Sequence, residues 1–556
     1  MGKMIPRTKM VLFVLAVVFF SGTVTGFILT TDSEFFFKIN KSIDIFGRVY
    51  KEVASNYVDT VDPEKFMRAG IDGMLDVLDP YTVFIDEKES EEVELITTGK
   101  YGGIGVTIGL RDGYITVISL MEGYSAEKQG LEVGDRIIEI EDESAIDMKP
   151  LDVRSLVRGT PGTEVHMKID RKGEPLPIEF VLIREEIQVR NISYSDYLKG
   201  GIAYIKIDRF SRRAGDELRV AIKDLKSKGT VEGVILDLRG NPGGLLDVAV
   251  DVVDKFVAKG SLVVKTRGRA SDSEKSYHAS EEPMLGNNPL VVLVNRNSAS
   301  ASEIVAGTVQ DLDRGLILGT RTFGKGLVQT ITQLSYNTKL KITTSKYFTP
   351  SGRSIQEIDY MHRDGDGVFL TIPDTLRRVY KTKNGRSVYE GGGIMPDSVV
   401  KEEQHSRLYK ELLRKAMFFK FATHYFSSHR EIDTEFLITE DILSEFRRYM
   451  DDYEFTYQDE LEIKLSGLKQ ILQDSEYSIA MEEKIEDLSK QIEAEKLGAF
   501  ERSKEGIRRA LEAELMARYE GEEARIRSTF PYDQQLQVAL HLIEDPALFR
   551  QYLQPN

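Results

Sequence analysis

Two neighbouring stretches decide the fold and the chemistry of this chain: Pro289-Leu-Val-Val-Leu-Val-Asn-Arg-Asn-Ser-Ala-Ser-Ala-Ser-Glu303 and Phe323-Gly-Lys-Gly-Leu-Val-Gln329. The first begins with an apolar, β-branched run that is typical of a buried strand. The segment 304–310 that follows predicts a helix. A serine at such a corner lies beside unpaired N–H groups of the first helical turn, which can stabilise a developing oxyanion.

A serine hydroxyl is a weak nucleophile at neutral pH and needs a base to activate it. The chain has seven His, and none lies near this stretch. A lysine can act as the base when burial disfavours its ammonium form. Lys325 lies between two glycines, and Gln329 would share its face on a regular strand. The spacing does not choose among the candidate serines Ser298, Ser300, Ser302 and Ser261, and a plain turn without catalytic role stays open.

These motifs resemble those of the carboxyl-terminal processing proteases, a family of Ser/Lys peptidases. The resemblance covers roughly residues 35–400. It implies that Ser300 is the nucleophile, that Lys325 is the general base and that Gln329 orients the lysine. It also implies an acyl-enzyme mechanism that needs no cofactor and no metal.

A second strand, loop and helix lies upstream, with Asp237-Leu-Arg-Gly-Asn-Pro-Gly-Gly244 as its loop. The resemblance implies that Gly243 or Gly244 and Ala301 supply the N–H groups of an oxyanion hole, while Arg239 and Asn241 brace the loop. A phosphate-binding loop is the alternative, but no Gly-Lys-Ser/Thr follows. Alternating strands and helices over residues 186–400 predict an α/β catalytic core with a mixed sheet.

Residues 99–185 resemble an inserted PDZ domain, with Ala126-x-x-x-Gly-Leu-x-x-Gly-Asp-x-Ile137 as the most specific motif. Such a domain adds an extended peptide to its sheet and holds the terminal carboxylate on N–H groups of a glycine-rich loop. The candidates for this loop are Gly102, Gly103, Ile104 and Gly105. A β-bulge or turn without a ligand is the alternative. Arg158 is expected to be a solvated arginine.

The N-terminal region predicts an anchor followed by helices. Basic residues precede an uncharged run from Met10 to Thr31, which is long enough to span a bilayer. The positive flank predicts a cytoplasmic tip and an exported catalytic part, which is periplasmic or extracytoplasmic. A cleaved signal peptide is the alternative. Residues 35–98 predict amphipathic helices, the second of which begins after Asp62-Pro63.

The composition narrows the range of partners. The net charge of −16 argues against nucleic acid, and the absence of Cys excludes disulfides and a thiolate nucleophile. Residues 401–556 predict an all-helical C-terminal domain, either a packed appendage or a surface for oligomerisation or an adaptor protein. The expected domains are residues 1–31 (cytoplasmic tip and transmembrane anchor), 35–98 (helical region), 99–185 (PDZ domain), 186–400 (serine peptidase core) and 401–556 (helical domain).

Together these features predict a serine endopeptidase, single-pass in the inner membrane, that recognises protein C-termini and forms a homo-oligomer. The alternatives are an inactive, membrane-anchored PDZ scaffold and an esterase or amidase for small substrates, which a PDZ module disfavours.

Overall fold

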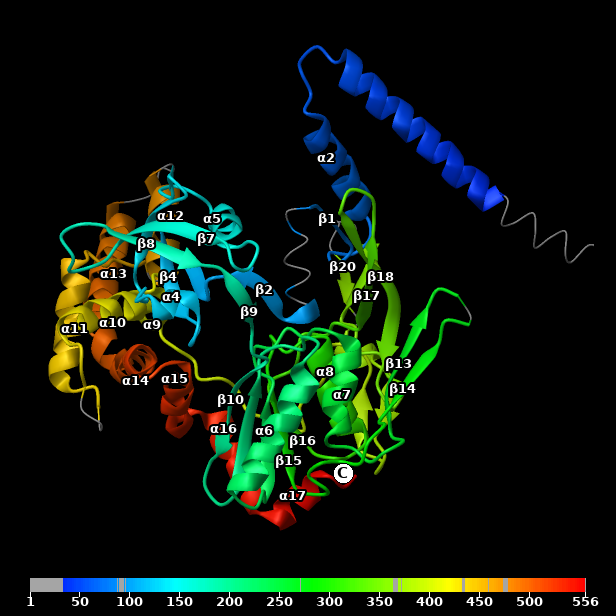
Figure 1. The fold of residues 1–556 in the computed structure, drawn as a ribbon. Coiled ribbons are helices and arrows are strands. Elements are labelled where there is room, and N and C mark those ends of the chain that lie inside the picture. The colour runs from blue at the N-terminus through cyan, green and yellow to red at the C-terminus, as the bar shows by residue number, and fades with distance from the viewer. Residues whose placement is uncertain are drawn as a thin grey trace, which may run out of the picture. The chain divides into compact units, whose positions relative to one another are not determined.

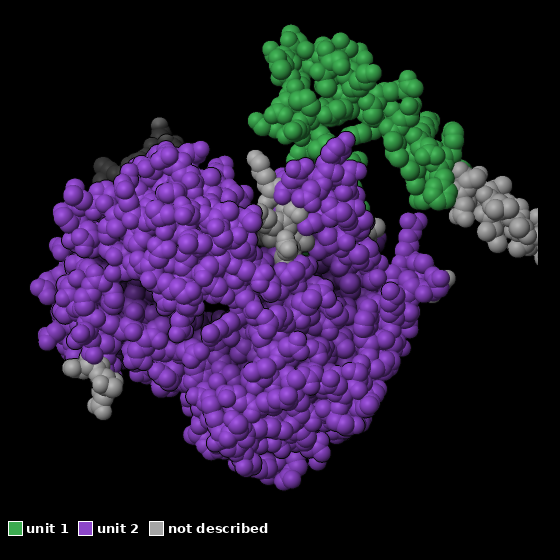
Figure 2. All heavy atoms as spheres, viewed as in Figure 1, with its two compact units in different colours: residues 1–84 green, residues 85–556 purple. Residues whose placement is uncertain are grey.

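The computed structural model describes residues 34–87, 89, 95, 97–270, 272–363, 369–371, 373–432, 436–458, 460–473 and 479–555. It contains two compact units, residues 1–84 and residues 85–556 (Figure 2). The predicted anchor over residues 10–31 lies outside the described residues. No helix within the described ranges combines the length and hydropathy of a membrane span.

The first unit is helical, as the sequence predicts. A helix covers residues 34–56, and α2 (Pro63–Leu75) follows. Asp62 caps α2, because its carboxylate accepts hydrogen bonds from the N–H groups of Glu64 and Lys65. Tyr50 stacks on Phe66 with ring centroids 5.3 Å apart, so the two helices share an aromatic contact. The short strand β1 (Val83–Ile85) spans the end of this unit.

The predicted PDZ domain contains a six-stranded sheet in the order β3-β4-β5-β7-β8, with β6 beside β5. Its elements are β3 (Val106–Arg111), β4 (Tyr114–Leu120), α4 (Ser125–Lys128), β5 (Arg136–Ile140), β6 (Glu143–Ser144), α5 (Pro150–Val157), β7 (Glu164–Asp170) and β8 (Ile178–Ile183). A two-stranded ladder of β2 (Lys100–Gly103) and β9 (Glu185–Gln188) joins the inserted domain to the core.

The predicted peptidase core contains a six-stranded mixed sheet in the order β10-β11-β12-β15-β16-β23, of which β10, β15 and β16 are labelled in Figure 1. Only β10 runs antiparallel to its neighbour. The strands are β10 (Ile192–Tyr197), β11 (Ile202–Ile207), β12 (Gly233–Asp237), β15 (Leu290–Val294), β16 (Leu316–Gly319) and β23 (Ser398–Val399). The helices α6 (Ala214–Lys228), α7 (Leu246–Asp254) and α8 (Ala301–Asp311) cover one face.

A second, antiparallel sheet lies beside this core. Its strands β17 (Leu327–Gln333), β18 (Lys339–Phe348), β13 (Leu262–Gly268) and β14 (Lys275–His278) pair in that order. The remaining elements of the region are β19 (Ile358–Arg363), β20 (Phe369–Thr371), η1 (Asp374–Leu376), β21 (Val379–Lys381) and β22 (Ser387–Tyr389).

The C-terminal region is helical, as predicted, and four of its helices surround one aromatic-rich cluster. Its elements are α9 (Arg407–Arg414), α10 (Met417–Ser428), α11 (Glu440–Asp452), α12 (Glu460–Gln473), α13 (Ile479–Leu497), α14 (Ala499–Tyr519), α15 (Glu522–Thr529), η2 (Phe530–Tyr532), α16 (Gln534–Glu544) and α17 (Pro546–Tyr552). These helices contact the PDZ domain: Lys420 pairs with Asp112 at 2.5 Å, and Arg430 pairs with Glu132 at 2.9 Å.

The last helices belong to the catalytic core. Along β15, Leu290, Val292 and Val294 pack toward α6–α8, and Val291 and Leu293 pack on the opposite face. That opposite face is covered by residues of α16 and α17, the red helices in Figure 1. The core therefore has three layers, with helices on both faces of the sheet.

Candidate active site

The turn between β15 and α8 holds Ser300 in an unusual backbone conformation. Ser300 has φ 53° and ψ −110°, a positive φ that L-residues rarely adopt and that costs about 1–3 kcal/mol. It is the residue directly before the first turn of α8, and its side chain is half-buried. A strained strand-to-helix corner of this kind presents a nucleophile at a helix N-terminus.

Hydrogen bonding distinguishes the four candidate serines. Ser298 and Ser302 are buried, and their hydroxyls donate to the carbonyls of Leu238 and Asn241 at 2.8 and 2.9 Å. Ser261 lies outside the turn, directly before β13. The Ser300 hydroxyl donates no hydrogen bond to any residue that the structure describes, and its side chain takes part in the capping box with Glu303 at the start of α8. Its hydroxyl is the one that remains available at the corner.

Glu303 connects the serine turn to the lysine loop. One carboxylate oxygen accepts the N–H groups of Ser300 and Lys325 at 2.8 and 2.9 Å. The other accepts the Gly324 N–H at 2.7 Å and the Thr322 hydroxyl at 2.6 Å. Because the Glu303 side chain is completely buried, these four donors replace its hydration.

Burial raises the pKa of Glu303 from its ordinary 4.5 to about 7, although all four donors favour the charged form and lower it. Desolvation outweighs the donors because the carboxylate has no access to water. Glu303 is not among the site residues predicted from the sequence. The Ser-x-x-Glu spacing of a capping box from Ser300 to Glu303 was the local signal that could have found it.

Tyr347 links the same two segments from the adjacent sheet. Its hydroxyl lies 3.1 Å from the Ser300 carbonyl oxygen and 2.7 Å from the Lys325 carbonyl oxygen. One hydroxyl proton is thus shared between two acceptors. Burial raises the pKa of Tyr347 well above its ordinary value, which keeps the phenol a donor. No local signal in the sequence connects Tyr347 with residues so far upstream.

The glycine loop lies against the serine turn. A Cβ built on Gly243, whose φ is 101°, would stand 2.9 Å from both the Ala301 nitrogen and the Ser300 Cβ. The Gly243 N–H donates to the Asn241 side chain at 2.9 Å. Within the described part of the chain, neither the Gly244 N–H nor the Ala301 N–H has an acceptor. Two N–H groups, one in the glycine loop and one directly after Ser300, are therefore available for an anionic oxygen.

Lys325 lies in a loop rather than in a strand. It is half-buried, and β17 begins two residues later at Leu327. The pairing register of β17 shifts between Val328 and Gln329, so strand alternation does not relate the two side chains. The Gln329 amide donates to the Thr343 hydroxyl at 3.2 Å. The roles of Lys325 and Gln329 stay predictions.

The predicted carboxylate-binding loop of the PDZ domain falls into two parts. Gly102 and Gly103 lie in β2 and pair with Glu186 and Glu185 of β9. Ile104 is buried, and Gly105 has φ 83° and lies against Tyr124. Only these last two residues lie between the ladder and β3, where N–H groups are free of strand pairing.

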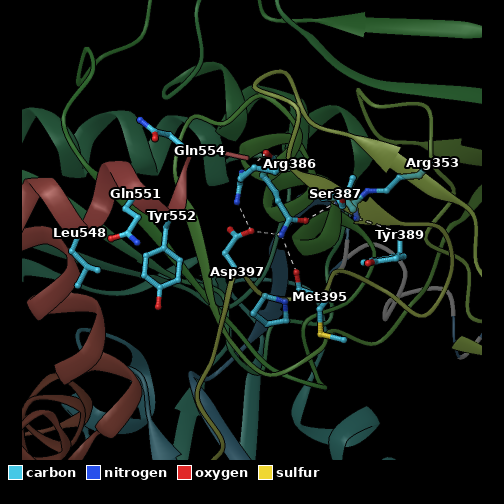
Figure 3. A pocket seen from close by; sticks show the side chains of 13 residues that line it. Arg353, Arg386, Ser387, Tyr389, Met395, Asp397, Leu548, Gln551, Tyr552 and Gln554 are labelled. Carbon is cyan, nitrogen blue, oxygen red and sulfur yellow. Dashed lines mark hydrogen bonds and ion pairs between the residues drawn. The ribbon is translucent and has the colours of Figure 1, made fainter. Parts of the chain in front are cut away.

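A cavity of about 660 Å³ lies at the other end of α8 (Figure 3). An α-helix rises about 1.5 Å per residue, so the length of α8 separates this cavity from Ser300. Arg386 pairs with Asp397 at 2.6 Å, and Arg353 pairs with Asp311 at 2.8 Å. The charges of these two arginines, which line the cavity, are therefore compensated. None of its lining residues is a predicted site residue. Over the described ranges, no group of three metal-ligating side chains occurs.

Comparison with known proteins shows that four segments of the chain match known protein families. Residues 201–361 match peptidase family S41, and residues 92–170 match the PDZ domain. Residues 408–543 match the C-terminal helical domain of a probable PDZ-protease, and residues 30–89 match the N-terminal domain of the activating protease CtpB.

Individual relatives agree with these matches. The carboxy-terminal-processing protease of Bartonella bacilliformis is 37% identical over 355 residues, which cover 63% of this chain and 81% of that protein. Carboxy-terminal processing protease CtpA of Bacillus subtilis is 31% identical over 344 residues, covering 61% and 72%. The chain belongs to the family of carboxy-terminal processing proteases, which confirms the predicted resemblance. Among solved structures, the photosystem II D1 C-terminal processing protease is 27% identical, covers 59% of this chain and 91% of its own, and has a TM-score of 0.33.

Proposed function

We propose that this protein is a serine endopeptidase that uses Ser300 and Lys325 to cleave protein substrates bound by their C-termini. The observation that carries the proposal is the double connection between the two segments. Glu303 binds the N–H groups of Ser300 and Lys325, and Tyr347 contacts their carbonyl oxygens. Membership of a peptidase family supports the same reading.

The reaction would proceed through an acyl-enzyme. Neutral Lys325 takes the hydroxyl proton while the Ser300 oxygen attacks the scissile carbonyl. The N–H groups of Gly244 and Ala301 stabilise the resulting oxyanion. Gly244 is preferred to Gly243 because the Gly243 N–H is already donated to Asn241. Lys325 then returns the proton to the leaving amine, and water hydrolyses the ester. Gln329 is proposed to orient the lysine.

The PDZ domain would select the substrate. An extended C-terminal peptide would pair with the domain's sheet while Ile104 and Gly105, with Gly102 and Gly103 before them, form the loop at its carboxylate. We place the catalytic part outside the cytoplasm and the run from Met10 to Thr31 in the inner membrane. Self-association and an adaptor protein would use the helical regions.

The test is cleavage of an unfolded protein with an apolar C-terminus by the full chain. We expect Ser300→Ala and Lys325→Ala to lose cleavage by at least about a thousandfold, because the nucleophile and its base act as a unit. Ser261→Ala, a half-buried serine outside the turn, is the matched control and should retain activity. An amidated or acidic tail on the same substrate should raise KM.

The competing function is a PDZ scaffold that binds tails without cutting them. It predicts tail binding of equal strength by the wild type and Ser300→Ala, with no cleavage by either. That result would reject the peptidase proposal.

A further inference from the structure

A buried ionic network joins the start of α16 to the glycine loop. Arg239 lies at the beginning of that loop and donates to both carboxylate oxygens of Asp237, at the end of β12. Its two terminal nitrogens form a fork with Asp533, at 3.0 and 2.6 Å. The same guanidinium also donates to the Gln535 side chain at 3.0 Å. The chain thus brings residues almost 300 positions apart onto one arginine.

The network is shielded from solvent. Asp237 is 1% exposed, and the side chains of Arg239 and Asp533 are 17% and 18% exposed. Burial alone would raise the pKa of Asp237, but the charge and hydrogen bonds of Arg239 hold it below its ordinary value. A paired fork of this kind fixes direction as well as distance, because both guanidinium nitrogens must meet both carboxylate oxygens.

Asp533 is itself held firmly. It caps α16 by accepting the Leu536 N–H at 3.0 Å. Leu536, Leu540 and Ile543 pack α16 onto the catalytic sheet. The Gln535 amide donates to the Val400 carbonyl at 2.7 Å. The carboxylate that meets Arg239 is therefore carried by a packed helix rather than by a free loop.

The glycine loop connects the position of Arg239 to the proposed oxyanion-binding amides and to Ser300. Asn241 follows Arg239 by two residues, and its side chain binds the Ile207 carbonyl and the Gly243 N–H. Its carbonyl accepts the Ala299 N–H at 3.1 Å and the Ser302 hydroxyl at 2.9 Å. A shift at Arg239 would therefore move the glycine amides relative to the turn that carries Ser300.

We propose that Asp533, supported by Gln535, is a positioning residue for the peptidase reaction: it clamps Arg239 so that the glycine loop presents its amides beside Ser300. This inference rests on the proposed function. It assigns part of the C-terminal helical region to catalysis, by way of the loop, in addition to its packing role.

The experiment compares two helix-capping aspartates in the full chain. Asp533→Ser keeps a good cap for α16, since Ser caps as well as Asp, but is too short to bridge to Arg239. Asp545→Ser is the matched control, because Asp545 caps α17 by accepting the N–H groups of Ala547 and Leu548 and makes no ion pair within the described residues. Both variants are measured for kcat, KM, thermal unfolding and hydrogen exchange of the amides at 239–245.

We expect Asp533→Ser to lower kcat about 10- to 100-fold with KM unchanged, as misplaced catalytic groups do. Exchange at 239–245 should rise in this variant alone. Equal effects of the two substitutions on kcat, or unchanged loop exchange in Asp533→Ser, would overturn the inference.

Two further comparisons keep the result decisive. If Asp533→Ser fails to fold, Asp533→Asn replaces it, because Asn preserves the cap and removes the charge of the fork; the same two outcomes then apply. A failure of the proposed function appears separately, as wild type that cleaves no faster than Ser300→Ala. The exchange measurement does not depend on cleavage, so it tests the clamp in either case.

Discussion

The carboxylate of Glu303 accepts the backbone N–H of Lys325 at 2.9 Å, through the same oxygen that accepts the N–H of Ser300. A single buried side chain thus sets the spacing between the proposed nucleophile and the segment that carries its base. The geometry leaves few ways to move one segment without the other. The consequences can be measured both in stability and in rate.

Stability should depend on pH through Glu303. Its folded pKa of about 7 exceeds its ordinary 4.5, so the folded state binds the proton more tightly than the unfolded state does. Protonation of Glu303 therefore adds to the free energy of unfolding. This contribution is complete below pH 4.5 and is lost as pH rises through 7, a change of roughly 3 kcal/mol. Urea unfolding of wild type and Glu303→Gln at pH 5 and pH 8 measures it. Relative to Glu303→Gln, the wild type should have a lower free energy of unfolding at pH 8 than at pH 5. A difference between the two proteins that does not change with pH would contradict the raised pKa of Glu303.

Tyr347→Phe should weaken both stability and activity. The substitution keeps the ring but leaves two carbonyl oxygens without their shared donor, which costs about 1–3 kcal/mol. The two segments would then separate slightly, and kcat should fall about tenfold or more. Thermal unfolding and peptide cleavage provide the measurements. Tyr336→Phe is the control, since Tyr336 is 87% exposed; equal effects at both positions would rule out the bridging role.

Gly243→Ala should lower activity strongly, whereas Gly240→Ala should leave it almost unchanged. Both glycines have positive φ, 101° and 75°, so both substitutions introduce backbone strain of about 1–2 kcal/mol. Only at Gly243 would the new Cβ also collide with the Ala299 oxygen, the Ala301 nitrogen and the Ser300 Cβ. We expect cleavage to fall at least a hundredfold for Gly243→Ala and to stay within a few-fold for Gly240→Ala. Similar losses would show that strain alone is responsible.

The C-terminal helix α16 should behave as part of the catalytic core. Leu536 is fully buried against the sheet, and its replacement by Ala should cost about 2–5 kcal/mol. Activity should disappear at the same temperature as the core unfolds. His541 lies on the exposed side of the same helix, so His541→Ala should leave the melting temperature unchanged. A Leu536→Ala protein as stable as wild type would place α16 outside the core.

Local patterns predicted the elements near the site well. The apolar run at 290–294 is a strand and the segment after Ser300 is a helix, as periodicity and turn residues predict. The preference for Ser300 over its neighbours needed the family resemblance, because only the fold buries Ser298 and Ser302 and occupies their hydroxyls. The Ser-x-x-Glu spacing from Ser300 to Glu303 also indicates a capping box, so Glu303 could have been predicted from the local sequence.

Long-range partners could not be predicted in this way. The apolar face of α16 indicates that this helix packs against something, but periodicity does not say which surface it covers. The ion pair between Arg239 and Asp533 forms only when α16 packs on the sheet, and the same packing covers the second face of the sheet. Tyr347 reaches Ser300 only because β18 lies beside the turn that holds Ser300 in three dimensions. Strand alternation failed to relate Lys325 and Gln329 because the strand starts after the lysine and its register then shifts.

The docking of α16 and α17 on the sheet also orders events during synthesis. Tyr204, Ile235 and Val291 emerge from the ribosome long before the helices that cover them. Until residues 534–552 have been translated, one side of the central layer is bare and Arg239 lacks its distal carboxylate. A nascent chain would thus complete the surroundings of Ser300 only after residues 92–170, which match the PDZ domain, have been translated.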